Sequence, residues 1–149
     1  MLSLIDPIRR LDNAREQSMS RPTIDQKITF VYCKDLEACA RFYTDVLGLA
    51  LAIDQGHCRI FRVAGEAFVG LCRCRADHSV SRDGVTLTLV TPDVDGWHRH
   101  LKEHDIEILA PPSESGEFQI YRFFARDPEG HLLEFQRFLS HDWPSVGSI

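Results

Sequence analysis

The spacing of hydrophobic residues changes at position 35, from that of a strand to that of a helix. Residues 28–33, ITFVYC, are rich in β-branched and aromatic side chains, which is typical of a strand. Asp35 is a good N-cap because its short carboxylate can accept the free N–H groups of a first helical turn, and Gly48 suits a helix end. The pattern therefore predicts a strand and then a helix that buries Leu36, Ala40, Tyr43 and Leu47, at spacings of four, three and four.

The same order of patterns returns 58 residues later in the chain. Residues 86–90, TLTLV, alternate like a strand, and Asp93 takes the place of Asp35 before a second helical stretch. That stretch has hydrophobic residues at spacings of three and four: Val94, Trp97 and Leu101. The two copies share little identity, so the shared order of elements carries the inference. An internal repeat of this kind predicts two copies of one structural unit.

Three strand-like segments are expected after each helix. In the first copy they are residues 49–54, 58–63 and 67–74, and in the second they are residues 106–110, 119–125 and 131–138. Residues 64–66 (AGE) and 127–130 (DPEG) suit tight turns, since Pro presets one dihedral angle and Gly accepts a positive φ. Residues 111–116, PPSESG, are expected to form a long loop. The fold class is therefore α+β, with two tandem βαβββ modules.

These patterns predict one domain over residues 27–138, with modules at 27–75 and 85–138 and a polar linker at 76–84. Residues 1–26 form an N-terminal extension, part of which can form an amphipathic helix through Leu4, Ile8 and Leu11. Its packing partner is left open: the core of the same chain or another subunit. Residues 139–149 form a C-terminal tail without a periodic pattern.

Composition narrows the possible partners and compartments. The net charge of −5 argues against nucleic acid, because phosphate binding needs a concentrated basic face. No apolar run approaches the roughly 20 residues that span a bilayer, and the N-terminus lacks the apolar core of a signal peptide. The five cysteines are odd in number and include no Cys-x-x-Cys, so we expect reduced cysteines and a cytoplasmic protein.

Two motifs, DLEACARFYTDVLGL in the first helix and DPEGHLLEF at the last turn and strand, resemble those of the vicinal oxygen chelate superfamily. That group includes glyoxalase I, extradiol dioxygenases, fosfomycin-resistance enzymes and bleomycin-resistance binding proteins. The resemblance runs from about Lys27 to Phe138. It implies that eight strands curl into a cup and that the protein pairs as a homodimer. It also implies a metal ion, held by side chains from the first and last strands of the modules.

The resemblance places the usual metal ligands at positions where this chain has few donors. The first strands offer Ile28 and Thr86, and the last strand of the first module offers Gly70 or Cys72. Glu134 alone matches a ligand position with a competent group. We therefore expect no cofactor and disfavour a divalent metal, although other side chains remain possible ligands: His57, His131 and the pair His100 and His104.

Glu134 lies between Leu133 and Phe135 in the last strand, and three roles for it remain open. It can recognise a ligand, or it can act as a general acid or base, because apolar surroundings favour the neutral carboxyl group. It can also be a remnant of a metal site that now pairs with an arginine such as Arg122. We name it as the candidate catalytic residue.

Strand alternation predicts which other residues face the cup. The candidate ligand-binding residues are Phe30, Tyr32, His57, Thr86, Thr88, Leu132 and Gln136, with Ile28 and Val90 on the same faces; Val31, Leu87 and Leu89 are expected to face the helices. Such a cup suits a small organic molecule whose amine, hydroxyl or amide meets Glu134. We expect binding, or metal-independent chemistry, and leave enzymatic turnover open. The alternatives are a metal-dependent lyase, isomerase or dioxygenase, and a partner-binding module that uses the N-terminal segment.

Overall fold

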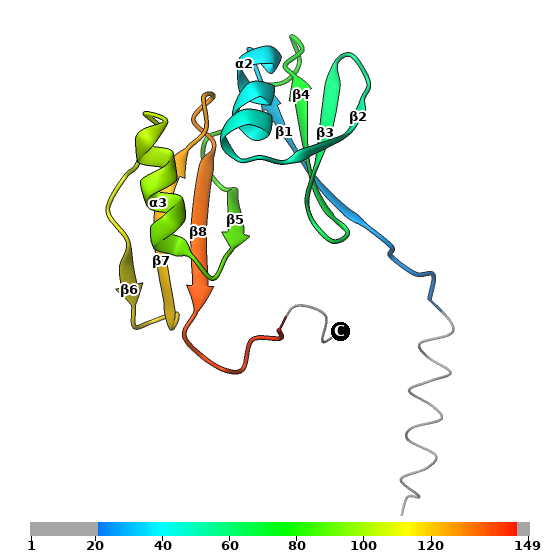
Figure 1. Cartoon of the computed structure of the whole chain (residues 1–149). Coiled ribbons are helices and arrows are strands. Elements are labelled where there is room, and N and C mark those ends of the chain that lie inside the picture. The colour runs from blue at the N-terminus through cyan, green and yellow to red at the C-terminus, as the bar shows by residue number, and fades with distance from the viewer. Residues whose placement is uncertain (1–20, 146–149) are drawn as a thin grey trace, which may run out of the picture.

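Two four-stranded sheets form the core of the structure, a computed structural model that describes residues 21–145 (Figure 1). The strands of the first sheet are, in spatial order, β1 (Lys27–Cys33), β4 (Ala67–Arg73), β3 (Cys58–Ala64) and β2 (Ala50–Asp54). Those of the second are β5 (Thr86–Val90), β8 (Leu132–Phe138), β7 (Ile120–Arg126) and β6 (Ser113–Ser115). In each sheet the first strand is parallel to the last and the other pairs are antiparallel. The predicted pair of βαβββ modules is confirmed.

The first helical segment begins and ends at the predicted residues, but it changes from an α-helix to a π-helix part of the way along. Asp35 Oδ1 accepts the Ala38 N–H at 3.0 Å and so caps α2 (Leu36–Arg41). A π-helical turn, η1 (Phe42–Val46), follows directly. Gly48 has a φ of 69°, which a residue with a side chain adopts at a cost. The four residues predicted to be buried are all buried: Leu36, Ala40, Tyr43 and Leu47.

Helix α3 (Val94–Glu103) repeats this design in the second module. Asp93 Oδ1 accepts the Gly96 N–H at 2.8 Å. Val94 and Leu101 are buried, and Trp97 is partly buried with its ring 5.2 Å from that of Phe135. The predicted stripe of α3 therefore packs on the second sheet.

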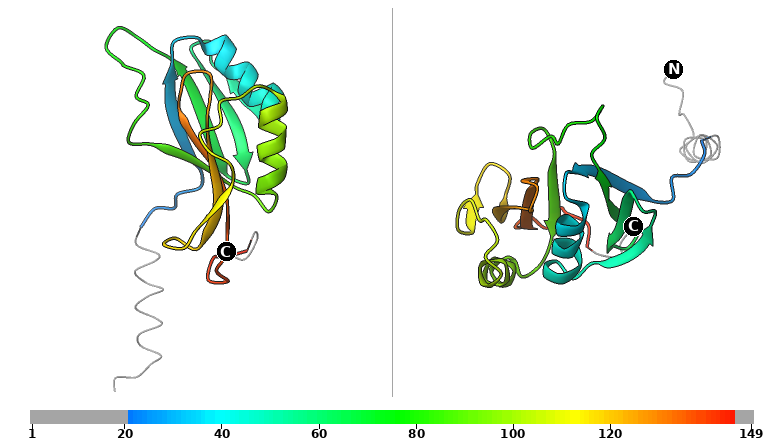
Figure 2. Two further views of the ribbon diagram at one scale, coloured as in Figure 1. Left: turned by 90° about the vertical axis from the view of Figure 1, so that its left-hand side faces the viewer. Right: turned by 90° about the horizontal axis from the view of Figure 1, so that it is seen from above.

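Both helices lie on the same side of the two sheets (Figure 2). Val31 is buried on this side, and Leu87 and Leu89 pack against the core, as alternation predicted. We call the opposite side of the sheets the cup face. Its residues include, by strand register, Ile28, Phe30, Tyr32, Phe68, Gly70, Cys72, Cys58, Ile60, Arg62, Thr86, Thr88, Val90, Leu132, Glu134, Gln136, Phe138, Ile120, Arg122, Phe124 and Arg126.

The prediction for residues 106–116 is wrong. Residues 106–110 do not form a strand, and Ile108 makes a single bridge to Ala125. The fourth strand of the second sheet is instead β6, inside the expected loop. This short edge strand is polar because it is largely exposed, so it lacks the hydrophobic alternation on which the prediction relied.

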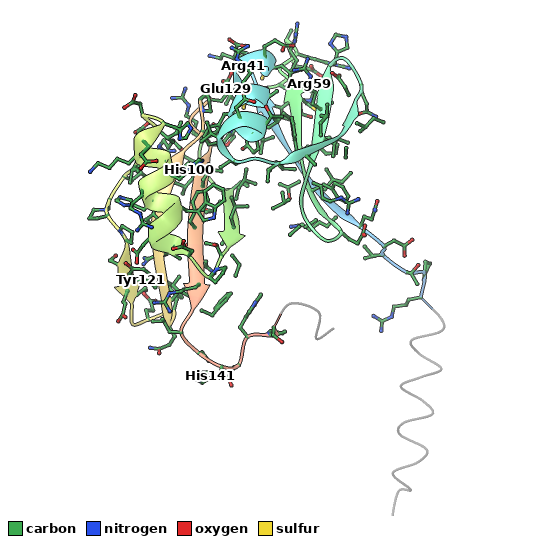
Figure 3. All side chains as sticks on the ribbon, in the orientation of Figure 1. Arg41, Arg59, His100, Tyr121, Glu129 and His141 are labelled. Carbon is green, nitrogen blue, oxygen red and sulfur yellow. A yellow bond between two sulfur atoms is a disulfide. The ribbon has the colours of Figure 1, made fainter. Side chains whose placement is uncertain are left out.

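The turn between β7 and β8 joins the two modules at the start of α2 (Figure 3). Asp127 is 4% exposed, and its Oδ1 accepts the N–H groups of Glu129 and His131 at 3.0 and 2.9 Å. Its Oδ2 accepts the Tyr43 hydroxyl at 3.1 Å and lies 2.7 Å from His131 Nδ1. Glu129 Oε1 accepts the N–H of Asp35 at 2.7 Å. These contacts connect the last turn of the second module to the helical segment of the first.

Burial and charge at this junction shift several ionisation equilibria, among them those of Tyr43 and His131. Burial and then the charge of Asp127 raise the pKa of Tyr43, so its hydroxyl stays protonated and donates. Burial alone would lower the pKa of His131, but the hydrogen bond and charge of Asp127, with a backbone hydrogen bond to Tyr32, raise it above its ordinary value. The folded protein therefore holds the His131 proton more tightly than the unfolded chain does.

Replacing Tyr43 with Phe is expected to lower the free energy of unfolding by about 1.5–3 kcal/mol, because the Asp127 carboxylate loses a buried donor. Urea denaturation measures this change. Tyr121→Phe is the matched control, since it removes a 2.7 Å hydrogen bond to Asp95 on an exposed surface and should have a much smaller effect. Equal losses in the two variants would contradict the role given to the junction.

The stability that His131 contributes should depend on pH. Since its pKa is raised on folding, that contribution is fully present below about pH 6.5, the unfolded value, and is lost as pH rises through the folded pKa. The difference in free energy of unfolding between the wild type and His131→Asn should therefore shrink from about pH 6 to pH 8. Both proteins share all other titrating groups, so a difference that is constant or grows with pH would refute the prediction.

Candidate functional site

Glu134 lies at the centre of the cup face of the second sheet. Its register partners are Thr88 on β5 and Phe124 on β7. The Thr88 hydroxyl donates to Oε2 at 2.9 Å, and Arg122 Nε lies 3.5 Å from Oε1. The Glu134 side chain is 13% exposed. Both carboxylate oxygens are therefore engaged, and the suggested pairing with Arg122 is present.

Arg122 shares this face with aromatic and polar neighbours. Its guanidinium carbon lies 5.3 Å from the centre of the Phe124 ring. In the strand register, Ser113 and Gln136 are the partners of Arg122 on either side. Arg122 and Phe124 escaped the prediction of ligand-binding residues. The sequence held a signal for them. Because β7 and β8 form an antiparallel hairpin around the DPEG turn, the residues of β7 opposite Glu134 and Gln136 share their face.

The cup face of the first sheet is mainly apolar. The Phe30 ring lies against Gly70, where an added Cβ would be 2.3 Å from Phe30 Cδ1. Glycine therefore makes room for this ring. Ile28 and Phe30 are 40% and 46% exposed, although Val31 and Cys33 on the other side of the same strand are buried. Tyr32 stacks on His78 of the linker, with ring centres 4.4 Å apart.

A disulfide between Cys58 and Cys72 lies on this apolar face. The expectation that all five cysteines are reduced is wrong for these two. They are direct register partners on β3 and β4, a relation that their separation of 14 residues does not reveal. Cys33, Cys39 and Cys74 are free. The cytoplasmic location was inferred from cysteines expected to be reduced, and the disulfide removes that support. The location stays a prediction.

The remaining predicted ligand-binding residues occupy two kinds of position. Thr86, Leu132 and Gln136 lie on the cup face of the second sheet, with Thr86 opposite Leu132 and Gln136 opposite Val90. His57 lies in the exposed turn before β3. Its neighbour Arg59, a weaker candidate, pairs with Glu37 of α2 at 2.6 Å and so lies on the helix side.

The donor set on the cup face does not fit the metal centre that the resemblance implies. Ile28 and Gly70 offer no donor, Cys72 is in a disulfide, and Thr86 offers a neutral hydroxyl. Glu134 is the single carboxylate at these positions, and the guanidinium beside it would repel a cation. A cup without metal stays a prediction that rests on this chemistry.

A second group of possible metal ligands is buried at the module junction: Cys39, Asp127 and His131. The 2.7 Å between Asp127 Oδ2 and His131 Nδ1 is shorter than the roughly 3.3 Å that zinc bond lengths imply for two tetrahedral ligands. Each side chain already has a hydrogen-bond partner. The cluster therefore acts as a hydrogen-bonded junction. His100, another candidate, contacts the Val46 carbonyl at 2.7 Å and connects α3 to η1.

The seam between the sheets encloses a cavity of about 250 Å³. Among the described residues, β1 pairs with β4 and β5 pairs with β8, so the two sheets are not hydrogen-bonded into one eight-stranded cup. The cavity is lined mainly by apolar side chains of both modules, including Leu47, Val63, Leu87 and Leu133, and Lys27 and Thr29 of β1 also line it. Thr88 also lines it and bonds Glu134, which connects the seam to the cup face.

Comparisons with known proteins agree with this architecture. The sequence model of the Glyoxalase/Bleomycin resistance protein/Dioxygenase superfamily matches residues 26–135. A glyoxalase/bleomycin resistance protein/dioxygenase from Nocardioides is 25% identical, with a TM-score of 0.64, over 91% of this chain and 97% of that one. No match was found among curated proteins.

Two further solved structures share the fold at lower identity. A lactoylglutathione lyase from Agrobacterium tumefaciens is 23% identical, with a TM-score of 0.63, over 78% of this chain and 95% of that one. TioX from Micromonospora sp. ML1 is 21% identical, with a TM-score of 0.64, over 76% of this chain and 98% of that one. In residues 21–145 no helix is long and apolar enough to cross a membrane.

Reducing the Cys58–Cys72 disulfide is expected to lower the free energy of unfolding by about 3 kcal/mol, because it releases a short closed loop in the unfolded chain. Urea denaturation with and without dithiothreitol measures the loss. Cys58→Ser should show the same loss without reductant and no further loss with it. Cys74→Ser is the control and should stay sensitive to reductant. Five titratable thiols in protein oxidised by glutathione disulfide would contradict the pairing.

Proposed function

Because the chain belongs to the Glyoxalase/Bleomycin resistance protein/Dioxygenase superfamily, we propose that it binds a small organic molecule on the cup face around Glu134, without the usual metal centre. One observation carries this proposal. The cup face joins a hydrogen-bonded polar group, Glu134 with Arg122 and Thr88, to a sheet whose Ile28 and Phe30 remain exposed.

A contiguous exposed hydrophobic surface often marks a binding site. Organic ligands are commonly bound by mostly apolar surfaces with a few fixed polar groups. The first sheet supplies the apolar part through Ile28, Phe30 and Tyr32. The second sheet supplies the polar part, so the two modules together offer an apolar surface with a few fixed polar groups.

Within this proposal, Glu134 serves recognition rather than proton transfer. A general base needs a lone pair directed at the substrate proton. Here one oxygen accepts the Thr88 hydroxyl and the other lies next to the Arg122 guanidinium. The remaining predicted contacts, Thr86, Leu132, Gln136 and His57, stay part of the proposed binding set.

The alternatives have less support. A metal-dependent lyase, isomerase or dioxygenase would need more donors than the described residues of the cup face offer. A partner-binding module would use the N-terminal segment, and residues 1–20 lie outside the described residues. We also propose a homodimer, which would cover part of the exposed apolar face.

A thermal-shift screen of small organic molecules tests the proposed binding. A true ligand at 100-fold over its Kd should add about 2.7 kcal/mol to the free energy of unfolding. The shift should survive treatment of the protein with EDTA. It should be lost in Phe30→Ala and in Glu134→Ala, which truncate one cup-face side chain of each sheet.

Arg99→Ala is the control variant, because Arg99 is exposed on α3, away from the cup face. Its ligand-induced shift should equal that of the wild type. A shift that disappears with EDTA and returns with a divalent ion would replace this proposal with the metal-dependent alternative. A shift that survives in both cup-face variants would place the ligand elsewhere.

A further inference from the structure

Arg122 has donor groups that Glu134 does not use. The closest contact between the Arg122 and Glu134 side chains is from Nε to Oε1, at 3.5 Å. Among residues 21–145, the terminal nitrogens of Arg122 have no hydrogen-bond acceptor. A guanidinium presents its donors as a flat fork, and the terminal pair matches a planar oxyanion in two parallel hydrogen bonds. The Arg122 side chain is 23% exposed, so part of it is open to solvent.

The charges on the cup face of the second sheet favour an anion. Arg122 and Arg126 lie on this face, and Glu134 is its single carboxylate among the described residues. Arg126 donates to the Gly130 carbonyl at 2.8 Å, which leaves its positive charge uncompensated. A ligand with a negative group is therefore attracted to this face, and an amine is repelled by the excess of guanidinium groups.

The surface beside Arg122 suits a flat apolar body. The Phe124 ring is on the same face, 5.3 Å from the guanidinium carbon. Val90 is also on this face, across Gln136 from Arg122, and is 55% exposed. An aromatic ring can pack against these side chains while an attached carboxylate reaches the terminal nitrogens of Arg122.

We propose that the ligand is an aromatic carboxylate, and that the terminal nitrogens of Arg122 bind its carboxylate group. This inference rests on the proposed function and reverses the expectation that an amine, hydroxyl or amide meets Glu134. Glu134 is a positioning residue: held by Thr88, it fixes the Nε side of the guanidinium so that the terminal nitrogens face the ligand.

NMR titration of the isotope-labelled full chain tests the inference, because it detects weak binding and locates it in the sequence. The probes are three matched sets in which one ring system carries a carboxylate, a neutral amide or an amine. They are benzoate, benzamide and benzylamine; naphthoate, naphthamide and naphthylmethylamine; and indole-3-acetate, indole-3-acetamide and tryptamine. The carboxylate should bind roughly tenfold or more tightly than its amide, with shifts concentrated in β7 and β8.

Variants separate the roles of the charged residues. Arg122→Gln should lower carboxylate affinity about tenfold or more and leave amide affinity unchanged. Arg126→Gln is the matched control on the same strand and should retain the preference for the carboxylate. Glu134→Ala should weaken carboxylate binding, whereas Glu134→Gln should largely restore it, because an amide oxygen can still lie next to Nε. Chemical-shift dispersion in each spectrum confirms folding.

The outcomes distinguish this inference from the proposed function. Amides or amines that bind on the cup face as tightly as the carboxylates would overturn the aromatic carboxylate and leave the proposed binding in place. An equal loss in Arg122→Gln and Arg126→Gln would overturn the assignment to Arg122. If no probe shifts cup-face resonances, the result counts against both the aromatic carboxylate and the proposed binding site. A ligand of another chemical class found in the thermal-shift screen would then support the proposed function and still overturn the aromatic carboxylate.

Discussion

The buried carboxylate of Asp127 holds the two modules in one arrangement. It receives hydrogen bonds from its own turn, from the His131 ring and from Tyr43 of η1. A buried carboxylate without such partners would cost several kcal/mol, so the turn and the helical segment stabilise it only when both are in place. Strand β8 starts directly after this turn, and the junction therefore sets where Glu134 lies relative to the first module.

Because both helices lie on one side, the two faces of the sheets have different roles. The helix side forms a common hydrophobic core, and the cup face is left to other purposes. The first sheet gives that face apolar side chains and a disulfide, and the second gives it Glu134, Arg122 and Arg126. Two copies of one unit have thus acquired different surfaces, because the repeat constrains the buried positions and leaves the outward ones free.

The family fold here carries a site of different chemistry. Positions 28, 70 and 86 have side chains without strong donors, and the remaining carboxylate pairs with a guanidinium. In the proposed site a fixed arginine takes the place of a metal ion: it keeps a positive group on the face, and a guanidinium can hold a planar oxyanion without coordination chemistry. The proposed preference for an aromatic carboxylate follows from that replacement.

The sequence by itself determined the repeated elements, the starts of the helices at Asp35 and Asp93, and the end of the first at Gly48, because capping and periodicity are local. It also determined which strand residues share a face, and the family resemblance then identified the poor metal donors and the isolation of Glu134. Only the tertiary structure decided the Cys58–Cys72 pairing, the edge strand β6 and the geometry of the Arg122 contact.

The junction shows the physical reason for this division. Tyr43 and Asp127 are 84 residues apart, and Asp35 and Glu129 are 94 apart. Local spacing predicted that Tyr43 is buried and that Asp127 lies in a turn, and both hold. It could not predict that they meet, because such contacts depend on strand register and on the packing of one module against the other.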